Sequence, residues 1–193
     1  MANEFYIYLS ILTPLITFFI TPLLSSTPNL RDSLGPIGGI ITFYSSLNIA
    51  SLYLNGEILS YTFFEINETL SISFKINGLG VIFGLVASGL WILASIYTIG
   101  YMRGNKEKNQ TRFFTFYSIA IFAAICIAYS GNLLTLFIFY EVLTFSTYPL
   151  VAHKQNKEAK KAGRLYMGIL VGTSIVFLLP AIIIVWVLTG SLD

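Results

Sequence analysis

Charged residues are scarce in this chain of 193 residues, where they make up 10% of the sequence. In soluble globular domains about a quarter of the residues are charged, so the composition is not that of a soluble domain.

The lone cysteine, Cys126, excludes a disulfide within the chain, and its place in an apolar run predicts a small core residue. The one histidine, His153, has no carboxylate or cysteine at ligand spacing, so we expect no metal site. We find no glycine-rich phosphate loop and no flavin or quinone motif, and therefore expect no cofactor. A formal net charge of +2 is too small to indicate a nucleic-acid partner.

Hydrophobic residues make up 55% of the chain and lie in long runs. The runs are long enough for helices of about 20 residues, and no barrel-like alternation dominates. The sequence therefore predicts an all-α integral membrane protein with about six transmembrane helices. The first run lacks the basic leader and cleavage site of a secretory signal, so we expect it to be retained. The expected spans are residues 5–24, 37–54, 79–102, 113–129, 132–152 and 165–188, with kinks expected at Pro14, Pro22 and Pro180.

The pattern changes between the second and third spans. Apolar and polar residues alternate over residues 70–76, and a looser extended run covers residues 58–66, with Asn67 and Glu68 as a turn. This pattern predicts a short β-hairpin on the membrane surface. The triplet Asn67-Glu68-Thr69 matches the glycosylation pattern, but three residues are too little to support that assignment.

Small and polar residues inside the spans indicate how the helices pack. Ser45, Ser46 and Asn48 are expected either to face other helices or to bond the carbonyls of their own helix. Glycines allow close approach of helices, and we expect them to do so in the third span and in the sixth. The residues concerned are Gly80, Gly84, Ala87 and Gly89 in the third span, and Gly168 and Gly172 in the sixth.

The basic residues indicate the orientation of the chain. If the six spans alternate, the loops with Arg31, residues 103–112 and residues 154–164 share one side and hold ten of the eleven Lys and Arg residues. By the positive-inside bias that side is cytoplasmic in a multi-pass protein of the cell (inner) membrane. Both termini and the hairpin are then extracytoplasmic. The basic loops are interpreted as orientation signals or contacts with anionic lipids.

Glu141 lies near the middle of the fifth predicted span, at about half the depth of the hydrocarbon. A carboxylate there is costly and usually serves an ion or proton pathway. Thr144, Phe145 and Tyr148 follow at helical spacing on its face, and Pro149 is expected to bend the helix beyond them. His153 could relay protons from the cytoplasmic mouth, although an interfacial histidine is the simpler interpretation. A protonated glutamic acid that only packs against a neighbouring helix remains the alternative for Glu141.

The segment around Glu141 resembles the antiporter-like proteins shared by Mrp-type cation/proton antiporters, respiratory complex I and membrane-bound hydrogenases. The resemblance rests on FYEVLTFSTYPLVAH, a basic loop and AGRLYMGILVG, which are similar to the D branch of the Mrp antiporters, and on LWILASIYTIGYMR and FAAICIAYSGNLLTLFIFYE. It covers residues 73–172. It implies that Glu141 is the proton-path glutamate of the fifth helix. Asn77 stands where many relatives have aspartate.

The same resemblance implies a division of the chain and a missing part. Residues 1–78 would hold two opening helices and the extracytoplasmic hairpin, and residues 79–193 would hold helices 3 to 6 with an incomplete first antiporter-like repeat. Family members are more than twice as long and are built from inverted repeats. They also carry a lysine in a broken seventh helix opposite the glutamate. No mid-membrane lysine can be assigned here, so the chain is interpreted as an amino-terminal portion.

These observations lead to one main hypothesis and three alternatives. The main hypothesis is an ion-translocating subunit of a multisubunit membrane complex, exchanging H⁺ for a cation such as Na⁺ through Glu141. It needs other membrane subunits, the carboxy-terminal half and the lipid bilayer, and has no catalytic chemistry of its own. The alternatives are a proton-pumping subunit of a complex I-type NADH:quinone oxidoreductase or membrane-bound hydrogenase, a structural or inactive truncated subunit, and a homo-oligomeric six-helix transporter.

Overall fold

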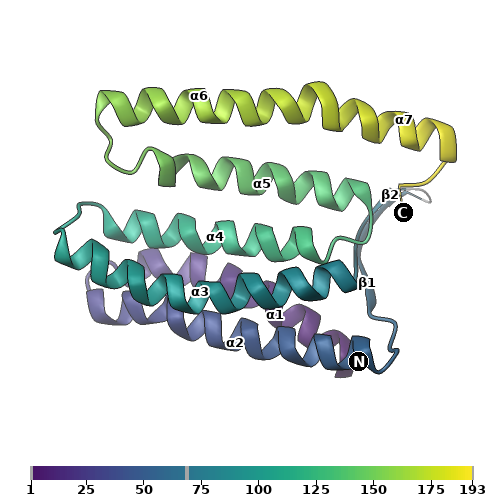
Figure 1. The fold of residues 1–193 in the computed structure, drawn as a ribbon, viewed down its shortest axis with the longest axis horizontal. Coiled ribbons are helices and arrows are strands. Elements are labelled where there is room, and N and C mark those ends of the chain that lie inside the picture. Colours follow the sequence, from purple (N-terminus) through teal and green to yellow (C-terminus); the bar gives the residue numbers. More distant parts are fainter. Residues whose placement is uncertain (1, 68–69, 193) are drawn as a thin grey trace.

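Six long helices lie side by side in the structure, a computed structural model that describes residues 2–67 and 70–192 (Figure 1). Each of the six is long and apolar enough to cross a membrane, which confirms the predicted number of spans among the described residues. The sixth is continuous but contains a π-helical segment. The helices are α1 (Ala2–Leu23), α2 (Pro28–Leu54), α3 (Gly78–Gly104), α4 (Gln110–Ala128), α5 (Leu133–Val151), α6 (Lys157–Thr173), the π-helical segment (Ser174–Leu178) and α7 (Leu179–Thr189).

An antiparallel hairpin of β1 (Ser60–Asn67) and β2 (Leu70–Lys75) joins α2 to α3. It runs across the helix ends at one end of the molecule (Figure 1). This confirms the predicted hairpin, whereas its position relative to a membrane stays a prediction. Glu68 and Thr69, which belong to the predicted turn and the glycosylation pattern, lie outside the described residues.

The connections alternate between the two ends of the bundle. The links from α1 to α2, from α3 to α4 and from α5 to α6 lie together at one end, which we call the loop end (left in Figure 1). The start of α1, the hairpin and the end of α7 lie at the opposite end, the hairpin end (Figure 1). Ten of the eleven Lys and Arg residues lie in these links or in the helix turns next to them, so they gather at one end of the bundle, whereas the side of a membrane that this end faces stays a prediction.

The helices form a cluster of four with two more helices added on one side. Helix α1 packs against α2 and α4, and α2 packs against α3. Helix α5 packs against α4, and α6 packs against α5 in the outermost position (Figure 1). The buried apolar core lies within the cluster α1–α4 and under β2, and includes Ile7, Ile49, Phe74, Ile125 and Cys126. The predicted core position of Cys126 is confirmed.

Polar residues in the second helix behave in both of the predicted ways. Ser45 Oγ donates a hydrogen bond of 2.5 Å to the backbone oxygen of Tyr6 in α1. Ser46 Oγ lies 3.2 Å from the hydroxyl of Tyr129, just after α4. Asn48 instead donates to the carbonyl four residues before it in its own helix. The two serines thus connect α2 to its neighbours, and the asparagine does not.

The prediction that the second helix begins at residue 37 was wrong, because α2 begins at Pro28. Residues 28–36, which the predicted spans left in the loop with Arg31, form the first turns of the helix. Proline is favoured at the first helical position, where its missing N–H group costs nothing. Arg31 and Asp32 therefore lie inside a helix and are buried, rather than in a loop.

The sixth helix also begins earlier than predicted, at Lys157 instead of residue 165. Asn156 caps it by accepting a 2.7 Å hydrogen bond from the amide of Ala159. Most of the basic segment predicted as a loop is thus the start of α6. Hydropathy finds the part of a helix that suits hydrocarbon and misses turns that continue beyond it.

Close helix contacts were predicted at glycines of the third and the sixth span, and the structure shows them in α3 but not in the sixth span among the described residues. A methyl group on Gly80 would collide with the backbone oxygen of Ala128, and one on Gly84 would collide with the ring of Tyr129. These glycines therefore let α3 approach the end of α4, as predicted. Gly168 and Gly172 have open space around them among the described residues, so they make no such contact within this chain.

Candidate functional site

Helix α5 is held at its start by the hairpin. Asn132 caps the helix by accepting a hydrogen bond from the amide of Thr135, at 2.8 Å. The Asn132 amide group also donates to the backbone oxygen of Ser71 and to Ser73 Oγ, at 2.8 and 2.9 Å. Thr135 Oγ1 in turn accepts from the amide of Ser73, at 2.9 Å. The helix that carries Glu141 is thus fixed at the hairpin end by buried polar contacts.

Glu141 lies in the middle of α5, as predicted. Its Oε1 atom is buried and has no hydrogen-bond partner among the described residues. A buried polar atom normally has a partner, and a missing one indicates a water molecule, an ion or a functional role. The carboxyl group is therefore placed where a proton, a water molecule or a cation would complete its surroundings.

The residues predicted to share the face of Glu141 differ in their surroundings. Thr144 is buried, at 3% exposure, whereas Phe145 is 54% exposed and turns away from the bundle. Tyr148 is half-buried, and its ring lies against Gly163 at the start of α6. Thr144 and Tyr148 thus stay within the bundle close to Glu141 along the helix, and Phe145 does not belong with them. Helix α5 continues through Pro149 to Val151.

A contact and a hollow between α5 and the last helix were not predicted from the sequence. Thr147 Oγ1 lies 3.3 Å from the hydroxyl of Tyr166, which pairs two polar groups between α5 and α6. Tyr140, next to Glu141 in the chain, lines a cavity of about 450 Å³ together with Ser174, Phe177 and other residues of the π-helical region. One polar contact and an open, mostly apolar groove therefore lie between α5 and the last helix.

His153 lies just beyond α5, at the loop end. Its Nε2 atom is 4.0 Å from Glu107 Oε2, and both ring nitrogens are buried and make no hydrogen bond to any described residue. Its backbone oxygen accepts from Arg112 Nη2 at 2.8 Å. Burial lowers the pKa of His153 below 6.5, the Arg112 charge lowers it further, and Glu107 acts in the opposite direction. No hydrogen bond among the described residues connects His153 to Glu141.

A buried ion cluster at the loop end was missed by the sequence analysis. Asp32 lies 2.6 Å from Arg31 and 2.6 Å from Arg103, and both Arg31 and Asp32 are almost fully buried. Arg31 also donates to Thr111 and Gln110, at 3.0 and 3.1 Å. The cluster connects the beginnings of α2 and α4 to the end of α3. The helix-start signal of Thr27-Pro28 could have revealed it by placing Arg31 and Asp32 inside a helix.

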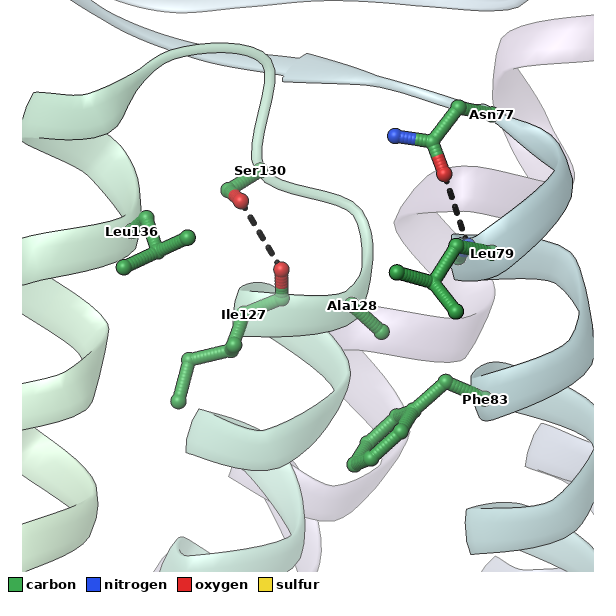
Figure 2. Close-up of a pocket in the computed structure, with 8 residues that line it drawn as sticks. Asn77, Leu79, Phe83, Ile127, Ala128, Ser130 and Leu136 are labelled. Atoms are coloured by element: carbon green, nitrogen blue, oxygen red, sulfur yellow. Dashed lines mark hydrogen bonds between the residues drawn. The ribbon is translucent and has the colours of Figure 1, made fainter.

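A second cavity lies at the hairpin end, where α3 begins beside the link between α4 and α5 (Figure 2). It has a volume of about 250 Å³ and a mostly apolar lining that includes Phe83, Ile127 and Leu136. Asn77, at its edge, accepts a 2.7 Å hydrogen bond from the amide of Gly80 and so caps α3 (Figure 2). Asparagine and aspartate are similarly good caps, so this structural role is open to either residue.

The described residues hold no group of three or more metal-ligating side chains at a common site.

The chain matches two family models. Residues 63–114 match the model described as NADH-ubiquinone oxidoreductase (complex I), chain 5 N-terminus. Residues 130–193, which include α5 and Glu141, match the model described as NADH:quinone oxidoreductase/Mrp antiporter, TM. Together the two matches cover more than half of the chain.

Curated relatives are antiporter subunits. The chain is 25% identical over 122 residues to putative antiporter subunit mnhA2 of Staphylococcus haemolyticus, covering 63% of this chain and 15% of that protein. It is 24% identical over 161 residues to Na⁺/H⁺ antiporter subunit A1 of Staphylococcus aureus, covering 81% of this chain and 20% of the relative. The chain thus spans a fifth or less of the length of these relatives. Both are named as A subunits, whereas the residues around Glu141 resemble the D branch of the Mrp antiporters.

The fold is also found in a solved structure. The chain is similar, with a TM-score of 0.80 and 19% identity, to a chain of the membrane-bound sulfane sulfur reductase, an archaeal respiratory membrane complex. The similarity covers 97% of this chain and 29% of that one. That similarity concerns the fold alone. The two family-model matches, which together cover more than half of the chain, show that it belongs to the family of antiporter-like membrane subunits that their descriptions name in complex I and in Mrp antiporters.

Proposed function

We propose that the chain is part of an ion-translocating membrane subunit in which Glu141 takes up and releases protons. The observation that carries this proposal is the buried Oε1 atom of Glu141, which has no hydrogen-bond partner among the described residues. It lies within the segment that matches the antiporter model. A carboxyl group retained at membrane depth is by default a candidate for an ion or proton pathway.

The physical basis is a change of proton affinity at a buried acid. Burial favours the protonated form of a carboxylic acid, and a nearby ammonium group favours the ionised form. Moving a cation toward or away from Glu141 would therefore load and release a proton. Arg31, the buried basic residue of α2, is already paired with Asp32 at the loop end. We propose that the pairing cation comes from another part of a longer protein or from another subunit.

Three further residues complete the proposed path. Thr144 is buried one turn after Glu141, and Tyr148 follows another turn later beside Gly163. Their hydroxyl groups can donate and accept hydrogen bonds and so support a chain of water molecules. His153 stands beyond the end of α5 and would exchange protons with the aqueous phase at the loop end. We propose that these residues lead from the loop end to Glu141.

The relatives indicate the exchanged ion and the partners. Two relatives are named as antiporter subunits, one of them as a Na⁺/H⁺ antiporter subunit. We therefore propose exchange of H⁺ for Na⁺ within a complex of several membrane subunits. On this proposal residues 79–193 hold helices of the first antiporter-like repeat, and residues 1–78 hold the opening helices and the hairpin.

Replacing Glu141 tests the proposed site. The complete membrane complex containing Glu141→Gln would be reconstituted in vesicles, and Na⁺-driven proton movement would be followed with a pH-sensitive dye. We expect the initial rate to fall at least tenfold, about 1.4 kcal/mol or more at the rate-limiting step. Glu158→Gln, which removes a carboxylate from the exposed first turn of α6, is the matched control. Wild-type transport in the Glu141 variant would favour the structural alternative, in which the acid stays protonated.

A redox-driven pump is the second candidate, because one matched model describes a complex I subunit and the solved structure is a respiratory complex. The same vesicles separate the two functions. An antiporter moves protons on addition of Na⁺ without an electron donor. A pump moves protons only when electrons flow and is insensitive to an imposed Na⁺ gradient.

We also propose that the loop end is cytoplasmic and the hairpin end extracytoplasmic. The support is the collection of basic residues at the loop end. Because Cys126 is buried, single cysteines can be introduced without a competing exposed thiol. In sealed inverted vesicles, a membrane-impermeant maleimide should label Lys108→Cys and leave Thr62→Cys in β1 unlabelled. The opposite pattern would reverse the topology without affecting the proposal for Glu141.

A further inference from the structure

A polar cavity lies between two loops at the loop end, away from Glu141. It has a volume of about 480 Å³ and is formed by the α3–α4 link and the α5–α6 link. The two links are brought together by Arg112, which donates to the backbone oxygen of His153. The residues that line the cavity are Lys106, Glu107, Lys108, Asn109, His153, Lys154, Gln155 and Asn156.

The charges around this cavity are mostly positive. Three of its lining residues are lysines, Lys106, Lys108 and Lys154, and they oppose one carboxylate, Glu107. Glu107 lies 4.0 Å from His153, whose two ring nitrogens are buried and unpaired. Arg112, which donates to the backbone oxygen of His153, adds another positive charge, and its buried Nε atom has no partner within residues 2–67 and 70–192. Such surroundings favour an anion over a cation.

Two helices begin at the edge of the same cavity. Asn109 precedes α4 and makes no side-chain capping hydrogen bond, whereas Asn156 caps α6 through the amide of Ala159. A helix N-terminus presents unpaired N–H groups and the positive end of the helix dipole. The start of α4 therefore has donors that its own cap does not satisfy. Both dipoles add to the positive potential of the lysines.

The backbone around the cavity is unusual. Within residues 2–67 and 70–192, the non-glycine residues with positive φ are Lys106, Asn109 and Gln155, with φ of 52°, 57° and 58°. All three line this cavity. The left-handed conformation costs about 1 kcal/mol or more for a residue other than glycine or asparagine, and such residues gather at binding sites. These three turned residues shape the two links where they line the cavity.

We propose that this cavity binds a phosphate group, either as inorganic phosphate or as the headgroup of an anionic phospholipid. The three lysines supply charge and the start of α4 supplies N–H donors, which is the common pattern of protein phosphate sites. The site is separate from Glu141 but shares His153 with the proton path proposed above; phosphate binding is measured directly, so its test does not depend on proton transfer through Glu141. Occupancy would tie the α3–α4 link to the α5–α6 link and so steady the loop end of α5.

Removing the lysines tests the site. The full chain, purified with its associated membrane subunits, would be titrated with inorganic phosphate by calorimetry. It would also be placed in nanodiscs containing phosphatidylglycerol or only phosphatidylcholine, and retained lipid would be counted by native mass spectrometry. The variant is Lys106→Gln, Lys108→Gln and Lys154→Gln together. The matched control is Lys157→Gln, Lys160→Gln and Lys161→Gln, which removes equal charge from exposed positions of α6 outside the cavity.

We expect affinity to fall about fivefold for each cavity lysine removed, and about a hundredfold in the triple variant, with little change in the control. Glu107→Gln should raise affinity about fivefold. Loss of phosphate binding identifies a site for free phosphate, whereas loss of retained phosphatidylglycerol alone identifies the headgroup as the ligand. The proposal is overturned if neither ligand binds the wild type, or if the control weakens binding as much as the cavity variant. Unchanged helical circular dichroism would exclude misfolding as the cause of a loss.

Discussion

The cluster α1–α4 and the pair formed by α5 and the last helix are built differently. In the most apolar 18-residue window of each span, 33–39% of the residues are buried for α1 to α4. The share is 17% for α5 and 11% for the helix from Lys157 to Thr189. Charge pairs, hydroxyl contacts and glycine contacts hold the first region together, whereas Glu141 belongs to the second. The proposed proton site thus lies where the chain packs least against itself and leaves room for water, a neighbouring subunit or movement.

The largest expected effect concerns the ion cluster of the tightly packed region. Asp32→Asn would leave Arg31 buried without its counter-ion, which should cost about 3–5 kcal/mol of the free energy of unfolding. Titration with sodium dodecyl sulfate in mixed micelles, followed by circular dichroism, measures this change. Arg103 is 43% exposed, so Arg103→Gln should cost no more than about 1 kcal/mol. Equal effects for the two variants would contradict a buried cluster.

Two helix caps compare the same chemistry in different surroundings. Asn132 caps α5, is buried and also bonds the hairpin, whereas Asn156 caps α6 and is exposed. Asn132→Ala should therefore cost about 2–3 kcal/mol, because it removes a cap and leaves hairpin acceptors unpaired. Asn156→Ala should cost about 1 kcal/mol. The same micelle titration checks both, and a larger effect at Asn156 would show that the hairpin does not hold α5.

Two glycine-to-alanine substitutions should change the free energy of unfolding in opposite directions. Gly80→Ala would place a methyl group against the backbone oxygen of Ala128 and should cost about 1–3 kcal/mol. Gly168→Ala meets nothing in the part of the chain that the structure describes and should be neutral or stabilising by up to about 1 kcal/mol, because alanine favours helices. Unfolding of the isolated chain measures both changes. If Gly168→Ala is harmful only in the assembled complex, another subunit packs on that face of α6.

The smallest expected effect is a pH dependence at His153. Because its pKa in the folded protein is below 6.5, folding disfavours its protonation. Its contribution to stability is fully present above about pH 6.5 and is lost as the pH falls through the lower, folded pKa. Comparing wild type and His153→Gln between pH 7.5 and 5 should show that only the wild type loses this increment of the free energy of unfolding as the pH falls. Parallel pH profiles would contradict the burial of His153.

The sequence was sufficient to locate the spans, the hairpin and Glu141, because hydropathy, alternation and an isolated charge are local signals. It did not reveal that Arg31 and Asp32 form a buried cluster with Arg103, since that contact joins residues about 70 positions apart. Nor could it decide which glycines touch a neighbour, because Gly80 and Gly168 occur in similar apolar runs. Distant contacts and the positions of unpaired atoms, such as Glu141 Oε1, required the three-dimensional structure.

The π-helical segment affects which residues of the last helix face the bundle. Gly163, Ser174 and Ile182 are the buried residues of this helix among those described. Gly163 and Ser174 are eleven positions apart, which is about three full turns, so they point the same way. Ser174 and Ile182 are eight positions apart, and in a regular α-helix their side chains would point in directions that differ by roughly 80°. In the segment the amide of Leu179 bonds Ser174, five residues back, so one extra residue is absorbed and the mismatch falls to about 20°. Deleting one residue there would remove the surplus and let a regular α-helix keep Ile182 on the inward face, whereas inserting one more residue would turn α7 by about a quarter of a circle.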